Sequence, residues 1–274
     1  MIRASRHGSL RRETRVSPFF QPRAVRPRRH ALTLPRSLVG GHDTSGTTLS
    51  WVVKFLADNP HAQATLRRQL RTAYAAAHAE GRQPSVVEIT KTSAPYLDAF
   101  VEESARVAPT LPIIIREAVV DTTVLGKPIP KGTSVVMYTN GPSYVFPGVP
   151  VAEELRSESS RAARQRVGVW DDETMARFTP ERWLKNKDPA EAGGGANEFD
   201  SVEFDAQSGP MLTFGAGPRG CFGRRLAYLE IRLVTALLVW NFEFEKCPEA
   251  LSSYNAKDIL TTMPRKCFVK LRRV

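Results

Sequence analysis

Apolar residues recur at helical spacing in four stretches of the chain, and each stretch predicts a helix. The first runs from Leu38 to Leu56 and stops before Asn59-Pro60, and the second covers residues 61–80. The third runs from Ser93 to Ala108, and the fourth begins behind Gly223. In the fourth helix we expect one face to be lined by Leu226, Leu229, Leu233, Leu237 and Trp240.

The segments between these helices have the patterns of short strands and of loops. Residues 112–137 are apolar runs broken by glycines and prolines, which predicts short strands, and two further strands are expected at Phe242–Glu245 and Cys267–Leu271. Residues 140–170 are polar and loop-like, and residues 186–210 have the composition of a glycine-rich linker. The pattern therefore predicts a mainly α protein with small β-sheets, in the α+β class.

The positive charge is concentrated at the N-terminus. Residues 1–36 contain ten arginines and one glutamate, so +9 of the net charge of +11 lies there and about +2 is left for the other 238 residues. A nearly neutral globular part does not support a nucleic-acid-binding surface. We therefore expect two regions: a basic, proline-broken, disordered tail at 1–36, and a folded domain at 37–274.

The sequence offers further readings of this tail. Arginine and serine with almost no acidic residues also fit a mitochondrial transit peptide, although prolines interrupt the expected amphipathic helix, and an incorrectly assigned coding start is a third reading. No apolar run approaches the roughly 18 residues that a membrane-spanning helix needs, so no membrane anchor is expected in this chain. The three cysteines do not form a disulfide framework, which favours an intracellular, reducing location.

One stretch carries the strongest chemical signal, the loop FGAGPRGCFG from Phe214 to Gly223. Glycines permit positive φ angles and a close approach to a flat ligand. Cys221 stands close to the start of the fourth predicted helix, where free N–H groups favour a thiolate, which is the form that binds metal. Arg219 adds a positive charge that could hold an acidic ligand group. The alternative is a buried, inert cysteine after a turn.

The spacing Phe-x-x-Gly-x-Arg-x-Cys-x-Gly resembles the haem-binding loop of the cytochrome P450 family in all five positions: Phe214, Gly217, Arg219, Cys221 and Gly223. The resemblance implies that Cys221 is the proximal thiolate ligand of haem (heme) iron, which favours O–O cleavage. It extends over residues 37–274 and implies the C-terminal half of the cytochrome P450 fold of a eukaryotic, fungal-like member.

The first predicted helix contains a second motif. Gly40-Gly41-His42-Asp43-Thr44-Ser45 resembles the oxygen-binding helix of the family. The Thr44 hydroxyl can bond back to the Gly40 carbonyl, and such a bond, or a π-type bulge, would open a groove in the helix. The resemblance implies that Thr44 holds oxygen and water at the iron and that Asp43 relays protons. The alternative is a surface helix that tolerates glycine.

Two further motifs follow in the family's order. Glu103 and Arg106 share a helix face and match the family's Glu-x-x-Arg motif. Phe178 to Trp183, which contains Arg182, resembles the family's Phe-x-Pro-Glu-Arg-Phe/Trp motif. The resemblance implies a structural network of Glu103, Arg106 and Arg182 that fixes the loop before the cysteine; alone, Glu103 and Arg106 would read as a surface ion pair. Arg116 lies in an apolar run, where a charge needs a partner, at the family's position for a haem-propionate arginine. Residues 140–170 are longer than the family's usual connection, which predicts an insertion.

The resemblance implies a haem-thiolate monooxygenase that takes electrons from NADPH through a reductase partner, the cytochrome P450 reductase, and inserts one oxygen atom of O2 into a small lipophilic substrate. Such enzymes usually lie at the endoplasmic reticulum. The alternatives are a haem-thiolate isomerase or dehydratase that does not use O2, or a non-catalytic truncated remnant. Because only half of the fold is expected, we predict weak haem binding and little turnover, and a natural product whose coding region extends further upstream.

Overall fold

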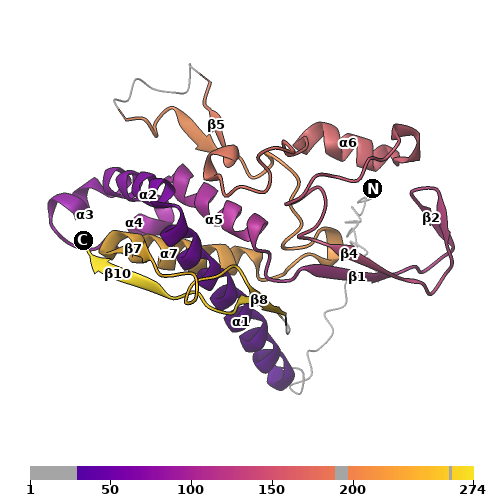
Figure 1. The fold of residues 1–274 in the computed structure, drawn as a ribbon, viewed down its shortest axis with the longest axis horizontal. Helices are drawn as coiled ribbons and strands as arrows, with labels where there is room; N and C mark the ends of the chain where they lie inside the picture. The colour runs from indigo at the N-terminus through magenta and orange to yellow at the C-terminus, as the bar shows by residue number, and fades with distance from the viewer. Residues whose placement is uncertain (1–29, 189–196, 259–260) are drawn as a thin grey trace, which may run out of the picture. The chain divides into compact units, whose positions relative to one another are not determined.

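The computed structural model describes the backbone of residues 30–188, 197–258 and 261–274, and the side chains of those residues from Gly40 onward. The chain divides into two compact units, Met1–Val39 and Gly40–Val274. Every side chain discussed below belongs to the second unit, whose helices and strands are labelled in Figure 1. The predicted disordered tail lies outside the described residues up to position 29 and so stays a prediction.

Seven α-helices and several short 3-10 turns account for the helical part of the described chain (Figure 1). Prolines begin two of the helices, α2 and α5, because the first turn has no use for the missing N–H group. Ser85 and Glu88 form a reciprocal capping box at the start of α4. The α-helices are α1 His30–Asp58, α2 Pro60–Ala73, α3 Ala75–Ala79, α4 Val86–Lys91, α5 Pro95–Val107, α6 Glu158–Val167 and α7 Arg224–Asn241. The 3-10 turns are η2 Glu153–Leu155, η3 Pro180–Trp183 and η4 Gly217–Arg219.

The four predicted helices are present, with changes at their ends. Helix α1 begins at His30 and thus earlier than the predicted start at Leu38. The second predicted helix is broken at Tyr74 into α2 and α3. Residues 140–170, predicted to be a loop, contain α6, which the Ser157 side chain caps and which ends at Gly168 with φ +67°.

The strands pair into five small antiparallel sheets of two strands each within the described residues. They are β1 Ile113–Glu117 with β4 Ser134–Tyr138, β2 Thr122–Val124 with β3 Lys127–Ile129, β5 Leu184–Asn186 with β6 Val202–Phe204, β7 Phe242–Lys246 with β10 Val269–Arg273, and β8 Ala256–Asp258 with β9 Thr262–Pro264. The α+β prediction is confirmed. The predicted linker at 186–210 is wrong in part, because β6 lies inside it and pairs with β5.

The main core lies where α1, α2, α5 and α7 pack together with β7. Phe55, Leu66, Phe100 and Val239 are fully or almost fully buried in it. A second, smaller cluster joins α5 to the segment after α6; its buried members are Ala99, Trp170, Met175 and Trp183. The two clusters together fix α5 on several sides, so α5 is a rigid base for the side chains that it carries.

The predicted leucine face of α7 is covered only in part: Leu233, Leu237 and Trp240 are partly buried and pack against the main core. Leu226 and Leu229 are exposed, whereas the buried positions are Ile231, Thr235, Ala236 and Val239. A leucine stripe at helical spacing indicates an apolar face but does not say which neighbour covers it.

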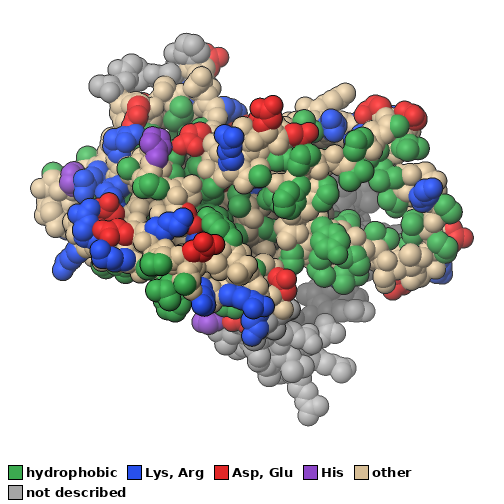
Figure 2. All heavy atoms as spheres, viewed as in Figure 1, with side chains coloured by type: hydrophobic (Ala, Val, Ile, Leu, Met, Phe, Trp, Pro, Cys, Tyr) green, Lys and Arg blue, Asp and Glu red, His purple; other side chains and the backbone are tan. Residues whose placement is uncertain are grey.

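Hydrophobic side chains also lie at the surface near β1 and β4 (Figure 2). Ile113, Ile115, Val136 and Tyr138 share one face of this two-stranded sheet and are all exposed. None of the described helices is both long and apolar enough to cross a membrane.

Candidate functional site

The loop before α7 presents Cys221 at the surface. Gly215 and Gly217 have φ angles of +67° and +64°, which L residues with side chains rarely adopt. These turns fold the loop back, so that the Cys221 N–H donates to the Phe214 carbonyl at 2.8 Å. The cysteine is therefore not the buried, inert residue of the alternative reading.

Cys221 does not lie in the first turn of the helix. Helix α7 begins at Arg224 after Gly223, and no side chain caps it. The first N–H of the helix, that of Arg224, donates to the Cys221 carbonyl at 3.4 Å, so the helix start lies against the residue that carries the sulfur. Phe222 is fully exposed next to the cysteine. The loop thus offers a soft sulfur donor with apolar surface beside it.

The donor set suits a cofactor that brings most of its own metal ligands. Within the described residues, no group of three or more His, Cys, Asp or Glu side chains could form a metal cage. A single exposed cysteine would suit haem iron, because the porphyrin would bring four nitrogen ligands of its own and the protein would add one sulfur. The residues present therefore fit haem.

Two predicted cofactor arginines have no acidic partner in the described part of the chain. Arg219 is exposed at the end of η4. Arg116 is exposed on β1, and its guanidinium donates to the carbonyl of neighbouring Ile115 at 2.9 Å. The expectation that the Arg116 charge needs a partner stays a prediction: Arg116 is exposed, as are Ile113 and Ile115 in the same strand, and no acidic side chain among the described residues pairs with it. Both guanidinium groups are open to a carboxylate from outside.

The predicted oxygen-binding motif lies on α1. The Thr44 hydroxyl donates to the Gly40 carbonyl at 2.6 Å, which is the bond expected from the sequence. Of the two alternatives that the sequence left open, the bond is the one observed, since the described backbone of α1 is α-helical throughout and has no π-type bulge. The Asp43 carboxylate is half exposed and lies 3.1 Å from His42 Nδ1. Next to them, Ser45 donates to Glu230 at 2.8 Å and so ties α1 to α7.

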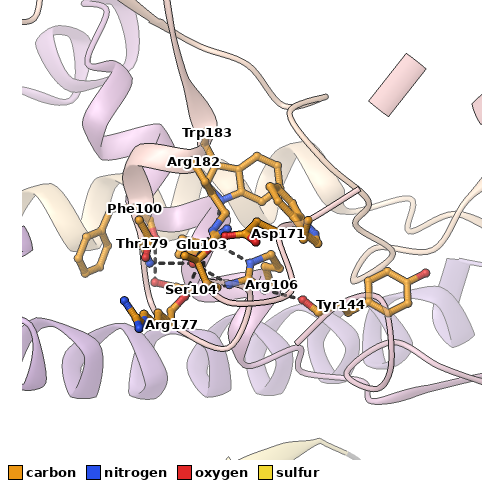
Figure 3. A network of polar contacts seen from close by, with 12 residues as sticks. Phe100, Glu103, Ser104, Arg106, Tyr144, Asp171, Arg177, Thr179, Arg182 and Trp183 are labelled. Atoms are coloured by element: carbon orange, nitrogen blue, oxygen red, sulfur yellow. Dashed lines mark hydrogen bonds and ion pairs between the residues drawn. The ribbon is translucent and has the colours of Figure 1, made fainter. Parts of the chain in front are cut away.

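The structure brings Glu103, Arg106 and Arg182 together in a buried network (Figure 3). Arg106 forms a bidentate pair with Glu103 at 2.7 and 2.8 Å, and Arg182 Nε lies 3.1 Å from the same carboxylate. Two further donors reach Glu103: the Thr179 N–H at 2.8 Å and the Trp183 indole at 2.9 Å. The carboxylate is thus fully occupied.

The network holds a different segment from the one predicted. Arg106 donates to the carbonyls of Tyr144 and Arg177, and Arg182 donates to those of Thr174 and Arg177 (Figure 3). All three acceptors lie well before the cysteine loop in the chain. The expectation that these side chains fix the loop before the cysteine is therefore corrected: they fix residues 174–183 and Tyr144 against α5.

Other residues of α5 contact the cysteine loop. The Thr213 hydroxyl donates to the Ala105 carbonyl at 2.8 Å, and Glu102 accepts a hydrogen bond from Tyr228 of α7. The Tyr228 ring packs against Phe214, the first residue of the loop. Sequence reasoning missed Glu102, Thr213 and Tyr228. The one sequence signal that could have found any of them is the acidic Glu102 directly before Glu103 on a helix with an apolar face.

Burial alters the acidity of Glu102. Its side chain is 2% exposed, and desolvation raises its pKa to about 7, against the hydrogen bond from Tyr228 and the charge of Arg224, which both lower it. Glu102 and Arg224 line two cavities, one of about 310 Å³ toward Asp98 and Arg232 and one of about 430 Å³ toward the loop.

Three comparisons with known proteins agree. A family model described as Cytochrome P450 matches residues 30–144 and 169–271. The gap between the two matched ranges falls inside the insertion predicted at 140–170 and contains α6.

Relatives in fungi are similar over most of this chain. The chain is 40% identical to the Hps1-dma1 cluster cytochrome P450 monooxygenase cyp3.1 of Dothistroma septosporum, over 85% of this chain and 75% of the relative. It is 42% identical to the cytochrome P450 monooxygenase TRI13 of Fusarium sporotrichioides, over 86% of this chain and 41% of the relative.

A solved structure shares the fold. The crystal structure of a cytochrome P450, CYP102L1, matches with a TM-score of 0.60 and 22% identity, over 88% of this chain and 45% of that chain. The chain thus spans less than half the length of TRI13 and of this structure, and three-quarters of the length of cyp3.1.

Proposed function

The chain belongs to the cytochrome P450 family, and from this premise we propose that it forms the thiolate side of a haem-dependent monooxygenase. The observation that carries the proposal is Cys221, an exposed sulfur on a loop that two positive-φ glycines close. Haem held by the Cys221 sulfur would supply the activation of O2 that lets one oxygen atom enter an organic substrate.

Arg116 and Arg219 are the candidates to bind the haem carboxylates. Both are exposed, and the described structure gives neither a carboxylate partner. A guanidinium binds a carboxylate with two parallel hydrogen bonds, which orients a flat ligand as well as holding it. Gly217 and Gly223 lend the loop the conformational freedom and small size that contact with a flat macrocycle requires.

Thr44 and Asp43 are the candidates to handle protons. The Thr44 hydroxyl proton is engaged with the Gly40 carbonyl, so its oxygen is free to accept a hydrogen bond from water. Asp43 follows on the exposed side of α1, where its carboxylate can exchange a proton with solvent. The pair therefore has the two parts of a proton relay.

Glu103, Arg106 and Arg182 have a structural role in this proposal. Their network fixes residues 174–183 on α5 and leaves no free hydrogen-bonding capacity on the carboxylate for a substrate. We assign them to the support of the fold on which the cysteine loop rests.

Electrons would come from NADPH through a reductase, and the substrate would be a small lipophilic molecule. Because the chain spans about two-fifths of the TRI13 length, a substrate pocket involves surfaces beyond those described. The proposed reductase would be met inside the cell, and enzymes of this family usually lie at the endoplasmic reticulum.

A haem-thiolate isomerase or dehydratase is the second candidate. It needs the same cysteine loop but no proton delivery to O2. The Thr44 bond to Gly40 next to the exposed Asp43 favours the monooxygenase, since that pair has no use in an isomerase.

The test is to load the chain with haem and to supply a cytochrome P450 reductase and NADPH. NADPH oxidation and O2 consumption that depend on the chain and fall severalfold in Thr44→Val support the monooxygenase. Haem loading with no chain-dependent O2 consumption would contradict the monooxygenase and leave the isomerase and the non-catalytic remnant. Absence of haem loading would contradict both proposals for this chain.

A further inference from the structure

Glu102 and Tyr228 link the two helices that border the cysteine loop. Glu102 lies on α5 directly before Glu103, but its carboxylate is directed to other partners and accepts a hydrogen bond from the Tyr228 hydroxyl of α7. Glu102 is 2% exposed and the hydrogen bond is part-buried, so water does not compete freely for it. A hydrogen bond to a buried carboxylate is among the stronger ones in proteins.

The Tyr228 ring continues this link to the loop. Its centroid lies 4.9 Å from that of Phe214, and the rings are tilted by 38°. The Arg224 guanidinium lies over both rings, 5.6 Å from the Phe214 centroid and 5.4 Å from the Tyr228 centroid. Phe214 in turn accepts the hydrogen bond from the Cys221 N–H through its carbonyl.

We propose that Glu102 and Tyr228 are the positioning residues of Cys221. The carboxylate holds the Tyr228 hydroxyl, the Tyr228 ring holds Phe214, and the Phe214 carbonyl holds the cysteine N–H. A second tether, from the Thr213 hydroxyl to the Ala105 carbonyl, fixes the residue before Phe214 to the same helix. The cysteine loop is thus held to α5 by side chains outside the Glu103 network.

The charges around Glu102 leave Tyr228 as its specific partner. Asp98, Glu102, Arg224 and Arg232 all line the smaller cavity with Tyr228. Arg232 is paired with Asp98, and Arg224 lies over the aromatic rings. On the other side, Arg166 of α6 and Tyr144 line the larger cavity with Glu102. Within the described residues, the Tyr228 hydroxyl is the hydrogen-bond donor on this carboxylate.

The inference that Glu102 and Tyr228 hold the cysteine loop does not require haem. The claim that they thereby position an iron ligand rests on the proposed function. The test therefore begins with the haem-free full chain and measures amide hydrogen exchange of the peptide that contains Cys221. Tyr228→Phe deletes one oxygen and keeps the ring, and Glu102→Ala removes the acceptor. Either change should speed exchange of the Cys221 amide roughly tenfold relative to amides of α2, since the hydrogen bond that holds Tyr228 is lost.

Two variants serve as controls. Glu102→Gln keeps an oxygen that can accept from Tyr228, so exchange at Cys221 should stay within about twofold of the wild-type rate. Tyr96→Phe removes a comparable bond, from the Tyr96 hydroxyl to Glu181 at 2.6 Å, on the same helix but toward η3. It should leave the ratio of Cys221 exchange to α2 exchange unchanged.

The second readout follows haem loading. In Tyr228→Phe and Glu102→Ala, a larger share of the reduced carbon monoxide complex should show a Soret band that lacks the red shift caused by a thiolate ligand. An unchanged Cys221 exchange ratio in both variants would overturn the inference, as would an equal increase in Tyr96→Phe. Failure of the wild-type chain to take up haem would instead contradict the proposed function and leave the exchange result standing.

Discussion

The Trp183 indole nitrogen donates a hydrogen bond of 2.9 Å to Glu103 Oε2, although 80 positions separate the two residues. Both residues are fully buried. Arg106 and Arg182 approach the same carboxylate, so two cations and two neutral donors share one acid. Removal of the negative charge would leave two desolvated guanidinium groups without a counter-ion.

Glu103→Gln should therefore destabilise the chain strongly. Loss of one member of a buried charge network typically costs about 3–5 kcal/mol, because the remaining charges stay buried and unpaired. Urea unfolding followed by tryptophan fluorescence measures the change, since Trp183 reports on this site.

Glu203→Gln is the matched control for that substitution. Glu203 forms its ion pair with Lys185 at 3.2 Å, and both side chains are about half exposed. A surface pair of this kind contributes less than about 1 kcal/mol. Equal unfolding midpoints for the two variants would contradict the structural role assigned to Glu103.

Thr48→Val should cost more stability than Thr44→Val, although the two threonines are one helical turn apart. Thr48 is buried and bonds to the Thr110 hydroxyl at 2.8 Å, so valine leaves Thr110 without that partner at a cost of about 1–3 kcal/mol. Thr44 is only partly buried and bonds within its own helix, and valine there should change stability by less than about 0.5 kcal/mol.

Thermal unfolding of the two variants in parallel checks this ordering. A large loss in Thr44→Val would mean that its hydroxyl is part of the fold and not reserved for chemistry. Thr44→Ser, which keeps the hydroxyl, separates loss of the hydrogen bond from loss of the methyl group.

The stability of the chain should depend on pH through Glu102. Its pKa is about 7 in the folded chain against an ordinary 4.5, because burial disfavours the carboxylate. The folded state then binds the proton more tightly than the unfolded state, so protonation of Glu102 stabilises the fold. This contribution to the free energy of unfolding is fully present below about pH 4.5 and is lost as the pH rises to about 7. The loss amounts to about 3 kcal/mol at most.

Glu102→Gln isolates this effect, because the other titrating groups cancel in the difference between the two chains. The two should have similar free energies of unfolding at pH 4, and the variant should be the more stable at pH 8. A constant difference over that range would show that the Glu102 carboxyl titrates normally.

The sequence predicted the positions of the helices and strands better than it predicted which side of each helix is buried. The helices α1, α2, α5 and α7 and the strands β7 and β10 were predicted from the sequence, whereas the pairing of these two strands was not. The fully buried positions of α7 did not follow from the sequence, because Leu226 and Ile231 are equally apolar and only the packing of α7 against its neighbours determines that Ile231 is buried. Helix α6 was missed, since a polar, arginine-rich helix has no apolar period to find.

The site residues also divide into those that the sequence could predict and those that it could not. Residues at fixed spacing in a motif, such as Cys221 and Glu103, could be found from the sequence. Tyr228 and Thr213 act through contacts with α5 that are formed over more than 100 positions of separation, and no local pattern encodes these contacts. Arg116 was expected to need a partner because its neighbours are apolar, but apolar neighbours do not by themselves indicate burial, and the strand that carries it is exposed.

The central claim is that Cys221 is the axial ligand of haem iron, and the reduced carbon monoxide difference spectrum tests it most directly. The chain is supplied with haem, reduced, and compared with Cys221→Ser and with Cys247→Ser, whose cysteine lies after β7. We predict a red-shifted, thiolate-type Soret band in the wild-type chain and in Cys247→Ser, and its loss in Cys221→Ser. The same band in Cys221→Ser, or its absence from the wild-type chain, would contradict the claim.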